Sequence, residues 1–365
     1  MLYSLRKFTG RPALTGLAAG LLAVAGSAAA SAEPYKADQP VKGVIRSQGF
    51  GLGGVYLQWQ EAFRKLQPDI IFQNNLPTSD LAFPALVTNV ADIGPNGGEP
   101  AIVEALSFFE THGYHSSHVI VATGSYDREG RSNGPVVFVH KDNPLTQLTI
   151  EQLDGIFGSE RSGGLDGYEW TLKGARAASQ DIRLWKDIGV KGPCANKPIR
   201  TFGHGPSGAT RFFQLHVLGG SDKWNPNYRG YVETGSKQLP PDERAEGLLG
   251  AKHMLANEIA RDPCSIGWSI MSQAKDIEGI KPVALAARGT RNFVMPSEQS
   301  FRDRSYPLAR NIYLYFDRPP GAPVEPRLKE FLSFALSDEG QKMVSDAGYL
   351  ALPPAMLAAQ RAKLN

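Results

Sequence analysis

Short apolar runs and amphipathic stretches alternate along the first part of the chain. Residues 55–68 carry apolar side chains three and four positions apart, among them Trp59 and Phe63, which is the spacing of one helix face. The apolar runs on either side have the length of buried strands. In order, the pattern predicts strands at 41–48 and 69–75, helices at 55–68 and 80–90, and a strand that breaks into a loop at 91–100.

A second alternating series begins near residue 135. It opens with an apolar strand at 136–140, and a helix with a capping signal follows at 149–157. The other predicted elements are a strand-to-turn segment at 181–189, strands at 197–202, 264–270 and 306–317, and helices at 242–263 and 327–348. The chain returns through 280–287 to the strand at 306–317. This alternation predicts an α/β protein whose mainly parallel sheets are flanked by helices.

Length and composition describe a globular protein with room for two domains. The chain has 365 residues, of which 42% are hydrophobic and 21% charged, as is typical of folded proteins. The net charge of +3 comes from residues spread along the chain rather than gathered in basic blocks. We therefore expect no nucleic-acid partner, and we expect no cofactor.

The N-terminal residues have the features of a secretory signal. Arg6 and Lys7 precede an apolar stretch at 13–25 that is too short to span a bilayer, and small residues then lead to a cleavage site after Ala32. We expect a signal peptide at 1–32 and a mature protein exported to the periplasm. An uncleaved membrane anchor is the alternative.

Two cysteines remain in the mature chain. In an exported protein, an even pair favours one disulfide, here between Cys194 and Cys264, over a metal site or a catalytic thiol. Such a bridge would close a loop of about 70 residues and contribute roughly 4 kcal/mol on a chain-entropy estimate. Two buried free thiols are the alternative.

The stretch "TFGHGPSGATRFFQLHVL" at 201–218 places Ser207 on a glycine-rich turn before a predicted helix. One interpretation is a nucleophile, because "GPSGA" resembles the G-x-S-x-G elbow of hydrolases. A serine nucleophile needs a histidine base and an acid. His216 lies too far along the same predicted helix, and His253 has no evident acid partner. The other interpretation is a donor to a bound anion.

Three histidines in "THGYHSSH" raise the question of a metal site. His112, His115 and His118 could line one helix face and bind a metal ion. Such a cluster is more often a solvated surface, and the chain has no zinc or calcium motif. We therefore expect no metal.

Several segments, in matching order and spacing, resemble the PstS-like phosphate-binding proteins of bacterial ABC transporters. They are "VFVHKDNPLTQLTIEQLDGIF", "NKPIRTFG" with "SGATRFF", "SIGW", "YPLARNIYLYFD" and "FLSFALSDEGQKMVSDAGYLALP". The resemblance covers nearly all of the mature chain. It implies a two-lobed periplasmic-binding-protein fold joined by a two-strand hinge. Lobe 1 would comprise 33–128 and 276–365, and lobe 2 would comprise 129–275.

The resemblance also implies an oxyanion site made of helix N-terminal amides and nearby hydroxyls. The first amides of a helix have no internal partner, and the helix dipole favours negative charge there. The residues that match the family's site, or stand nearest to it, are Gly51, Leu52, Thr78, Ser79, His204, Ser207, Gly208, Ala209, Thr210 and Arg211.

The chain departs from the family pattern at three places. His204 stands nearest to the position of a family arginine, for which Arg200 or Arg211 could substitute, and Ala209 replaces a threonine. "NGGE" at 96–99 stands where the family carries a carboxylate or a serine–arginine pair. The resemblance implies a monomer that binds phosphate and delivers it to an ABC permease. The alternatives are a receptor or scavenger for another anionic ligand, and a serine hydrolase or phosphatase using Ser207.

Overall fold

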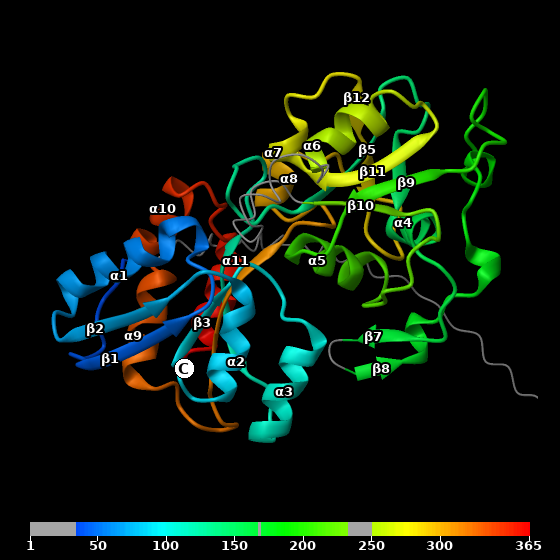
Figure 1. The fold of residues 1–365 in the computed structure, drawn as a ribbon. Helices are drawn as coiled ribbons and strands as arrows, with labels where there is room; N and C mark the ends of the chain where they lie inside the picture. Colours follow the sequence, from blue (N-terminus) through cyan, green and yellow to red (C-terminus); the bar gives the residue numbers. More distant parts are fainter. Residues whose placement is uncertain (1–33, 167–168, 233–249) are drawn as a thin grey trace, which may run out of the picture.

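The structure is a computed structural model that describes residues 34–166, 169–232 and 250–365. The signal peptide expected at 1–32 lies outside the described residues. Two five-stranded sheets, each flanked by helices, form two lobes (Figure 1). This confirms the two-lobed α/β fold.

The sheet of lobe 1 has the strand order β2-β1-β3-β14-β4. Its strands are β1 (Gly43–Gln48), β2 (Ile70–Asn75), β3 (Ile93–Asn96), β4 (Ser117–Thr123) and β14 (Asn311–Phe316). Strand β1 runs parallel to β2 and β3, whereas β14 runs antiparallel to β3 and β4. The sheet is therefore mixed rather than mainly parallel, because β14 returns from the other lobe in the opposite direction.

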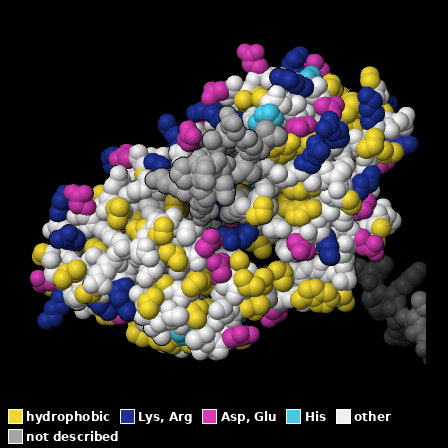
Figure 2. Space-filling model, viewed as in Figure 1, with side chains coloured by type: hydrophobic (Ala, Val, Ile, Leu, Met, Phe, Trp, Pro, Cys, Tyr) yellow, Lys and Arg dark blue, Asp and Glu magenta, His cyan; other side chains and the backbone are white. Residues whose placement is uncertain are grey.

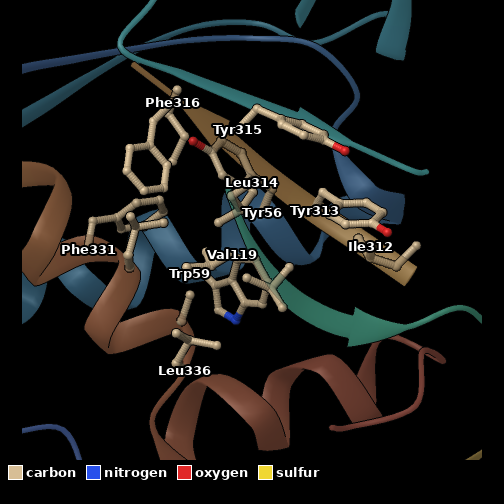
Figure 3. Packing of buried hydrophobic residues seen from close by; sticks show 14 of the residues in the cluster. Tyr56, Trp59, Val119, Ile312, Tyr313, Leu314, Tyr315, Phe316, Phe331 and Leu336 are labelled. Carbon is tan, nitrogen blue, oxygen red and sulfur yellow. The ribbon is translucent and has the colours of Figure 1, made fainter. Parts of the chain in front are cut away.

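Helices from both ends of the described chain cover this sheet. They are α1 (Val55–Leu66), α2 (Ala82–Val87), α3 (Ile102–His112), α9 (Pro326–Ala335), α10 (Asp338–Asp346) and α11 (Pro354–Ala362). Figure 3 shows Trp59 of α1 packed among Val119, Leu336 and their neighbours. The indole is fully buried, and its Nε1 donates to the Gly340 carbonyl at 3.0 Å. The apolar face expected at 55–68 thus joins α1 to the C-terminal helices.

Lobe 2 repeats the same pattern of pairing in the order β10-β9-β11-β5-β12. Its strands are β5 (Pro135–His140), β9 (Arg200–His204), β10 (Arg229–Tyr231), β11 (Ser265–Ile270) and β12 (Ile280–Pro282). Strand β9 is parallel to β10 and β11, and β5 is antiparallel to β11 and β12. Two small sheets accompany it, formed by β6 (Gln147–Thr149) with β13 (Ala284–Ala286), and by β7 (Gly164–Asp166) with β8 (Glu169–Thr171).

The described helices of lobe 2 are short, and the helix expected at 149–157 is confirmed as α4. They are α4 (Ile150–Phe157), α5 (Gly208–Val217), α6 (Ala251–Met254), α7 (Met271–Ala274) and α8 (Glu298–Arg302). The strand-to-turn segment expected at 181–189 forms a single β-bridge at Leu184 and then the 3-10 turn η5 (Trp185–Ile188). Of the long helix expected at 242–263, the described part forms α6 and a π-helical turn at Leu255–Ile259.

The disulfide between Cys194 and Cys264 is confirmed. It joins two buried residues of lobe 2 whose Cα atoms are 5.3 Å apart. The Trp185 indole donates to the Cys264 carbonyl at 2.9 Å. The bridge therefore fastens the η5 region to the start of β11.

The chain crosses between the lobes twice, near residues 124–134 and 308–311. The two crossings lie side by side, since the Gly124 amide donates to the Arg310 carbonyl at 2.7 Å. The second crossing lies beyond the boundary expected at 276. Strand β12 pairs with β5 of lobe 2, and Phe301 and Tyr306 belong to the lobe 2 core. A break at 276 would separate these residues from the sheet and core that bury them.

Within the described ranges, no helix combines the length and apolar character needed to cross a membrane.

Candidate functional site

The first glycine turn lies between β1 and α1 and has unusual backbone angles. Leu52, Gly53 and Gly54 have φ values of 47°, 59° and 95°. Leu52 is fully buried yet left-handed, a conformation that is strained for a residue with a branched side chain. Strained backbone of this kind is concentrated at ligand-binding and active sites, where it pre-organises backbone groups. The turn includes Gly51, which precedes the 3-10 turn η1 (Leu52–Gly54).

A second segment of lobe 1 packs against this turn. The Thr78 amide donates to the Gly49 carbonyl at 3.0 Å, and Phe50 bridges to Pro77. Ser79 lies at the start of η2 (Ser79–Leu81), and its Oγ accepts from the Gly97 amide at 3.2 Å. The two lobe 1 segments that the sequence pointed to, 51–52 and 78–79, therefore lie next to each other in the structure.

The glycine turn of lobe 2 delivers Ser207 to the start of α5. Its Oγ accepts from the Thr210 amide at 3.2 Å and so caps the helix. The Thr210 hydroxyl lies 3.1 Å from Ser207 Oγ and donates to the Gly205 carbonyl. Gly208 and Ala209 supply the first amides of α5, which precede the capped amide and have no partner within the helix.

His204 does not join this group. Its ring is fully buried, stacks on Trp268 with centroids 4.8 Å apart, and has Nε2 2.9 Å from Ser269 Oγ. The cause is its position at the end of β9, an interior strand of the lobe 2 sheet. The side chain therefore packs inside lobe 2 rather than at the boundary between the lobes.

The hydrolase alternative lacks its base in this arrangement. His216 Nε2 lies 3.4 Å from a Glu99 oxygen, and His253 Nδ1 lies 3.2 Å from Asn257 Nδ2. Ser207 Oγ bonds to Thr210 instead. The histidines that could have formed a triad with Ser207 are thus engaged elsewhere.

The three neighbouring histidines do not share a helix face. His112 ends α3 and stacks on Phe108, whereas His118 lies in β4. Burial lowers the pKa of His118 to about 4, so its ring is neutral at physiological pH. In the part of the chain that the structure describes, no group of three His, Cys, Asp or Glu side chains could hold a metal ion.

Two ion pairs join the lobes along α5. Arg211 lies 2.8 Å from Asp80, and both side chains are more than a third exposed. His216 pairs with Glu99, which also accepts from the Tyr313 hydroxyl at 2.8 Å. Burial raises the pKa of Glu99, but the bonds from His216 and Tyr313 outweigh it and hold the pKa below its usual range. The carboxylate is therefore ionised when it bridges the lobes.

Arg310 lies at the same boundary, although the sequence pattern did not point to it. Its side chain emerges from the second crossing and is 9% exposed. Nη2 donates to the Gly208 carbonyl at 3.3 Å, and a β-carbon at Gly98 would lie only 2.7 Å from Nη2. A basic residue within the strand expected at 306–317 was the only sequence signal. Nothing in the residue pattern indicated that it meets a turn 102 positions earlier.

The departure at 96–99 also has a structural reason. A β-carbon at Gly97 would contact the Ser132 hydroxyl, and one at Gly98 would overlap Arg310. Larger residues do not fit where the two crossings approach this loop. The acid of this segment, Glu99, contacts Tyr313 and His216 instead.

Comparisons with known proteins agree with this geometry. Residues 132–339 match a PBP superfamily domain. The chain is 30% identical over 347 residues to the phosphate-binding protein PstS of Pseudomonas aeruginosa, covering 93% of this chain and 94% of that one. PstS from Borrelia burgdorferi shares the fold at 15% identity, with a TM-score of 0.52 and coverage of 85% and 99%. An ABC-type phosphate transport receptor from Vibrio cholerae does so at 16% identity, with a TM-score of 0.50 and coverage of 84% and 99%.

Proposed function

This chain belongs to the PstS-like phosphate-binding proteins of the PBP superfamily, and from that premise we propose that it is an exported receptor for inorganic phosphate. The anion would be held where the lobes meet, and the loaded protein would deliver it to the permease of an ABC transporter. The family is one of binding proteins, so no reaction is assigned.

The observation that carries the proposal is the meeting of two turns from different lobes. The turn at Gly51 and Leu52 with Thr78 and Ser79 belongs to lobe 1, and Ser207 with the first amides of α5 belongs to lobe 2. The Asp80–Arg211 pair, at 2.8 Å, joins the residue after Ser79 to the first turns of α5. Amides and hydroxyls converging from two sides suit a tetrahedral oxyanion.

The hydroxyl of Ser132 bears on which oxyanions are accepted. It lies against Gly97, a residue of the 96–99 loop, where the family carries a carboxylate. A carboxylate can only accept a hydrogen bond, so it favours an anion that still carries a proton, whereas a hydroxyl both donates and accepts. We therefore expect phosphate and arsenate to bind. With a hydroxyl in place of the carboxylate, sulfate should also be discriminated against less strongly.

Calorimetric titration of ligand-stripped protein with phosphate, arsenate and sulfate tests the proposal. We expect phosphate to bind with micromolar or tighter affinity, and Ser207→Ala to weaken it about tenfold or more, since the hydroxyl both contacts the anion and caps α5. Ser297→Ala is the matched control. Ser297 also caps a helix, with its Oγ accepting from the Ser300 amide at 3.1 Å, but in α8.

Phosphate affinity should be the same in Ser297→Ala as in the unaltered protein. The proposal fails if folded protein binds no phosphate. If Ser207→Ala and Ser297→Ala bind phosphate equally well, the placement of the anion at Ser207 fails.

A further inference from the structure

We infer that Arg310 supplies the positive charge that holds the bound anion. This rests on the proposed function, because it assigns a residue to the same oxyanion site. The assignment differs from the expectation that Arg200, His204 or Arg211 carries this charge. Its basis is where each of these side chains lies in the fold.

The guanidinium of Arg310 is fixed between the two lobes. Its backbone carbonyl accepts from the Gly124 amide of the first crossing at 2.7 Å. On the lobe 1 side, the side chain packs on Gly98, whose absent β-carbon leaves room for Nη2 and Nε. On the lobe 2 side, Nη2 bonds to the Gly208 carbonyl at 3.3 Å. The guanidinium carbon also lies 5.7 Å from the centroid of the Phe212 ring.

This position is at the first turn of α5, where the proposed anion meets lobe 2. Gly208 is the first residue of that helix, and a β-carbon there would lie 3.2 Å from Arg310 Nη2. A planar guanidinium presents donors in a fork that matches two oxygens of a phosphate group. Because the side chain is nine-tenths buried, solvent screens its charge less than that of an exposed residue.

The other candidate cations are committed to different partners. Arg211 pairs with Asp80 and is 37% exposed. Arg200 bonds to Glu258 and Asp262 at 3.0 and 2.9 Å. It begins β9, whereas the glycine turn follows the end of that strand, about 13 Å further on at 3.3 Å per residue.

A cation at this point has a consequence for how the lobes respond to ligand. Arg310 belongs to the segment that crosses between the lobes, and it touches a loop of one lobe and a helix of the other. An anion bound to it would therefore contact both lobes and the crossing at once. Binding of a charged ligand and the position of the two lobes relative to each other are therefore coupled through the Arg310 side chain.

The test compares Arg310→Gln and Arg310→Lys with Arg318→Gln by calorimetric titration with inorganic phosphate. Arg318 follows β14 as Arg310 precedes it, and its guanidinium also bonds to backbone carbonyls, those of Ala322 and Lys363 at 2.7 and 2.6 Å. Losing a charge-assisted contact should weaken phosphate binding roughly tenfold to a hundredfold in Arg310→Gln. Arg310→Lys should retain part of the affinity, and Arg318→Gln all of it.

The outcomes separate this inference from the proposed function. If the unaltered, folded protein binds no phosphate, the proposed function fails first. If it binds phosphate and Arg310→Gln binds equally well, the inference alone is overturned. Should Arg310→Gln unfold, Arg310→Lys decides. The side chain keeps its charge but loses the planar fork, so phosphate affinity unchanged within twofold in folded protein would overturn the inference.

Discussion

The two lobes have the same sheet but different means of holding it together. In each, two parallel pairings are followed by two antiparallel ones across five strands. Lobe 1 assembles this sheet from both ends of the described chain and relies on contacts between residues far apart in sequence. Phe63 of α1, for example, packs on Phe331 of α9 with ring centroids 5.4 Å apart.

Lobe 2 uses one continuous segment and adds covalent and ionic ties. The Cys194–Cys264 bridge is one of them. Another is the buried Asp154, which accepts from Arg161 at 2.7 Å and lies 3.3 Å from Arg176. These links anchor the long connecting segment between α4 and β9, which includes the β7–β8 hairpin (Figure 1). Apolar burial joins distant segments in lobe 1, whereas specific links restrain a long connecting segment in lobe 2.

Exposed apolar side chains occur on both lobes. Figure 2 shows hydrophobic side chains exposed over α3 of lobe 1 and over the β7–β8 hairpin of lobe 2. Val103 of α3 is 69% exposed, and Trp170 and Leu172 of the hairpin region are 62% and 70% exposed. The connecting segment of lobe 2 thus carries apolar surface that its own core does not bury.

The largest effect should come from the apolar core of lobe 1. Replacing Trp59 by alanine removes a fully buried indole and its bond to Gly340, and should lower the free energy of unfolding by about 3–5 kcal/mol. Leu57→Ala on the same helix is the control, because Leu57 is 50% exposed, and should cost under about 0.5 kcal/mol. Urea denaturation of both variants measures the difference. Equal losses would show that burial by α1 does not hold lobe 1.

Opening the disulfide should be the next largest change, and it should act on lobe 2. Replacing Cys194 and Cys264 by serine should cost about 2–4 kcal/mol, and the sequence separation of 70 favours the upper end. Four of the five tryptophans, Trp170, Trp185, Trp224 and Trp268, belong to lobe 2, so tryptophan fluorescence reports mainly the transition of that lobe. Adding a reductant should destabilise the unaltered protein and leave the double-serine variant unchanged. Two titratable thiols in unreduced protein would contradict the bridge.

The smallest effect should come from the Glu99 bridge between the lobes, and it should depend on pH. Because the pKa of Glu99 lies below its usual range in the folded protein, its contribution is present at neutral pH and lost as pH falls through that lowered value. Glu99→Gln should cost about 1–2 kcal/mol at pH 7. The titratable and charged groups around the carboxylate are His216, Tyr313, Arg304 and His118.

Unfolding measured from pH 7 down to about 3 should show the two proteins converging at the acid end. Glu61→Gln is the control. Glu61 is 77% exposed and pairs with Lys65 on α1, so its loss should be small at every pH. A difference between Glu99→Gln and unaltered protein that stays constant across the range would exclude an ionised carboxylate in the bridge.

Local pattern was enough to locate most elements. Periodicity placed β1, α1 and β5 within two residues of their bounds, because each buries one face, or both, along a continuous stretch. It could not assign β12 and β13 to lobe 2, since an apolar run of three or four residues does not reveal which strand it pairs with. For that reason the boundary expected at 276 precedes two strands, β12 and β13, that pair with β5 and β6.

The candidate site was predictable only where its chemistry is local. The turns at Gly51 and Ser207 are visible in sequence because glycines before a helix have a specific backbone use. The orientation of His204 depends on which face of β9 packs on Trp268, and the reach of Arg310 depends on how two crossings lie together. Both are properties of tertiary packing, which short patterns do not encode.

The interleaving of lobe 1 also bears on the order in which the lobes can assemble. Strand β14 lies between β3 and β4 in the sheet, yet it is made of residues 311–316. As the chain is synthesised, the strands of lobe 2 are all available before β14 exists, while β3 and β4 wait for the strand that separates them. Lobe 2 can therefore form first. A chain interrupted before residue 311 would retain one lobe and lose the middle of the other.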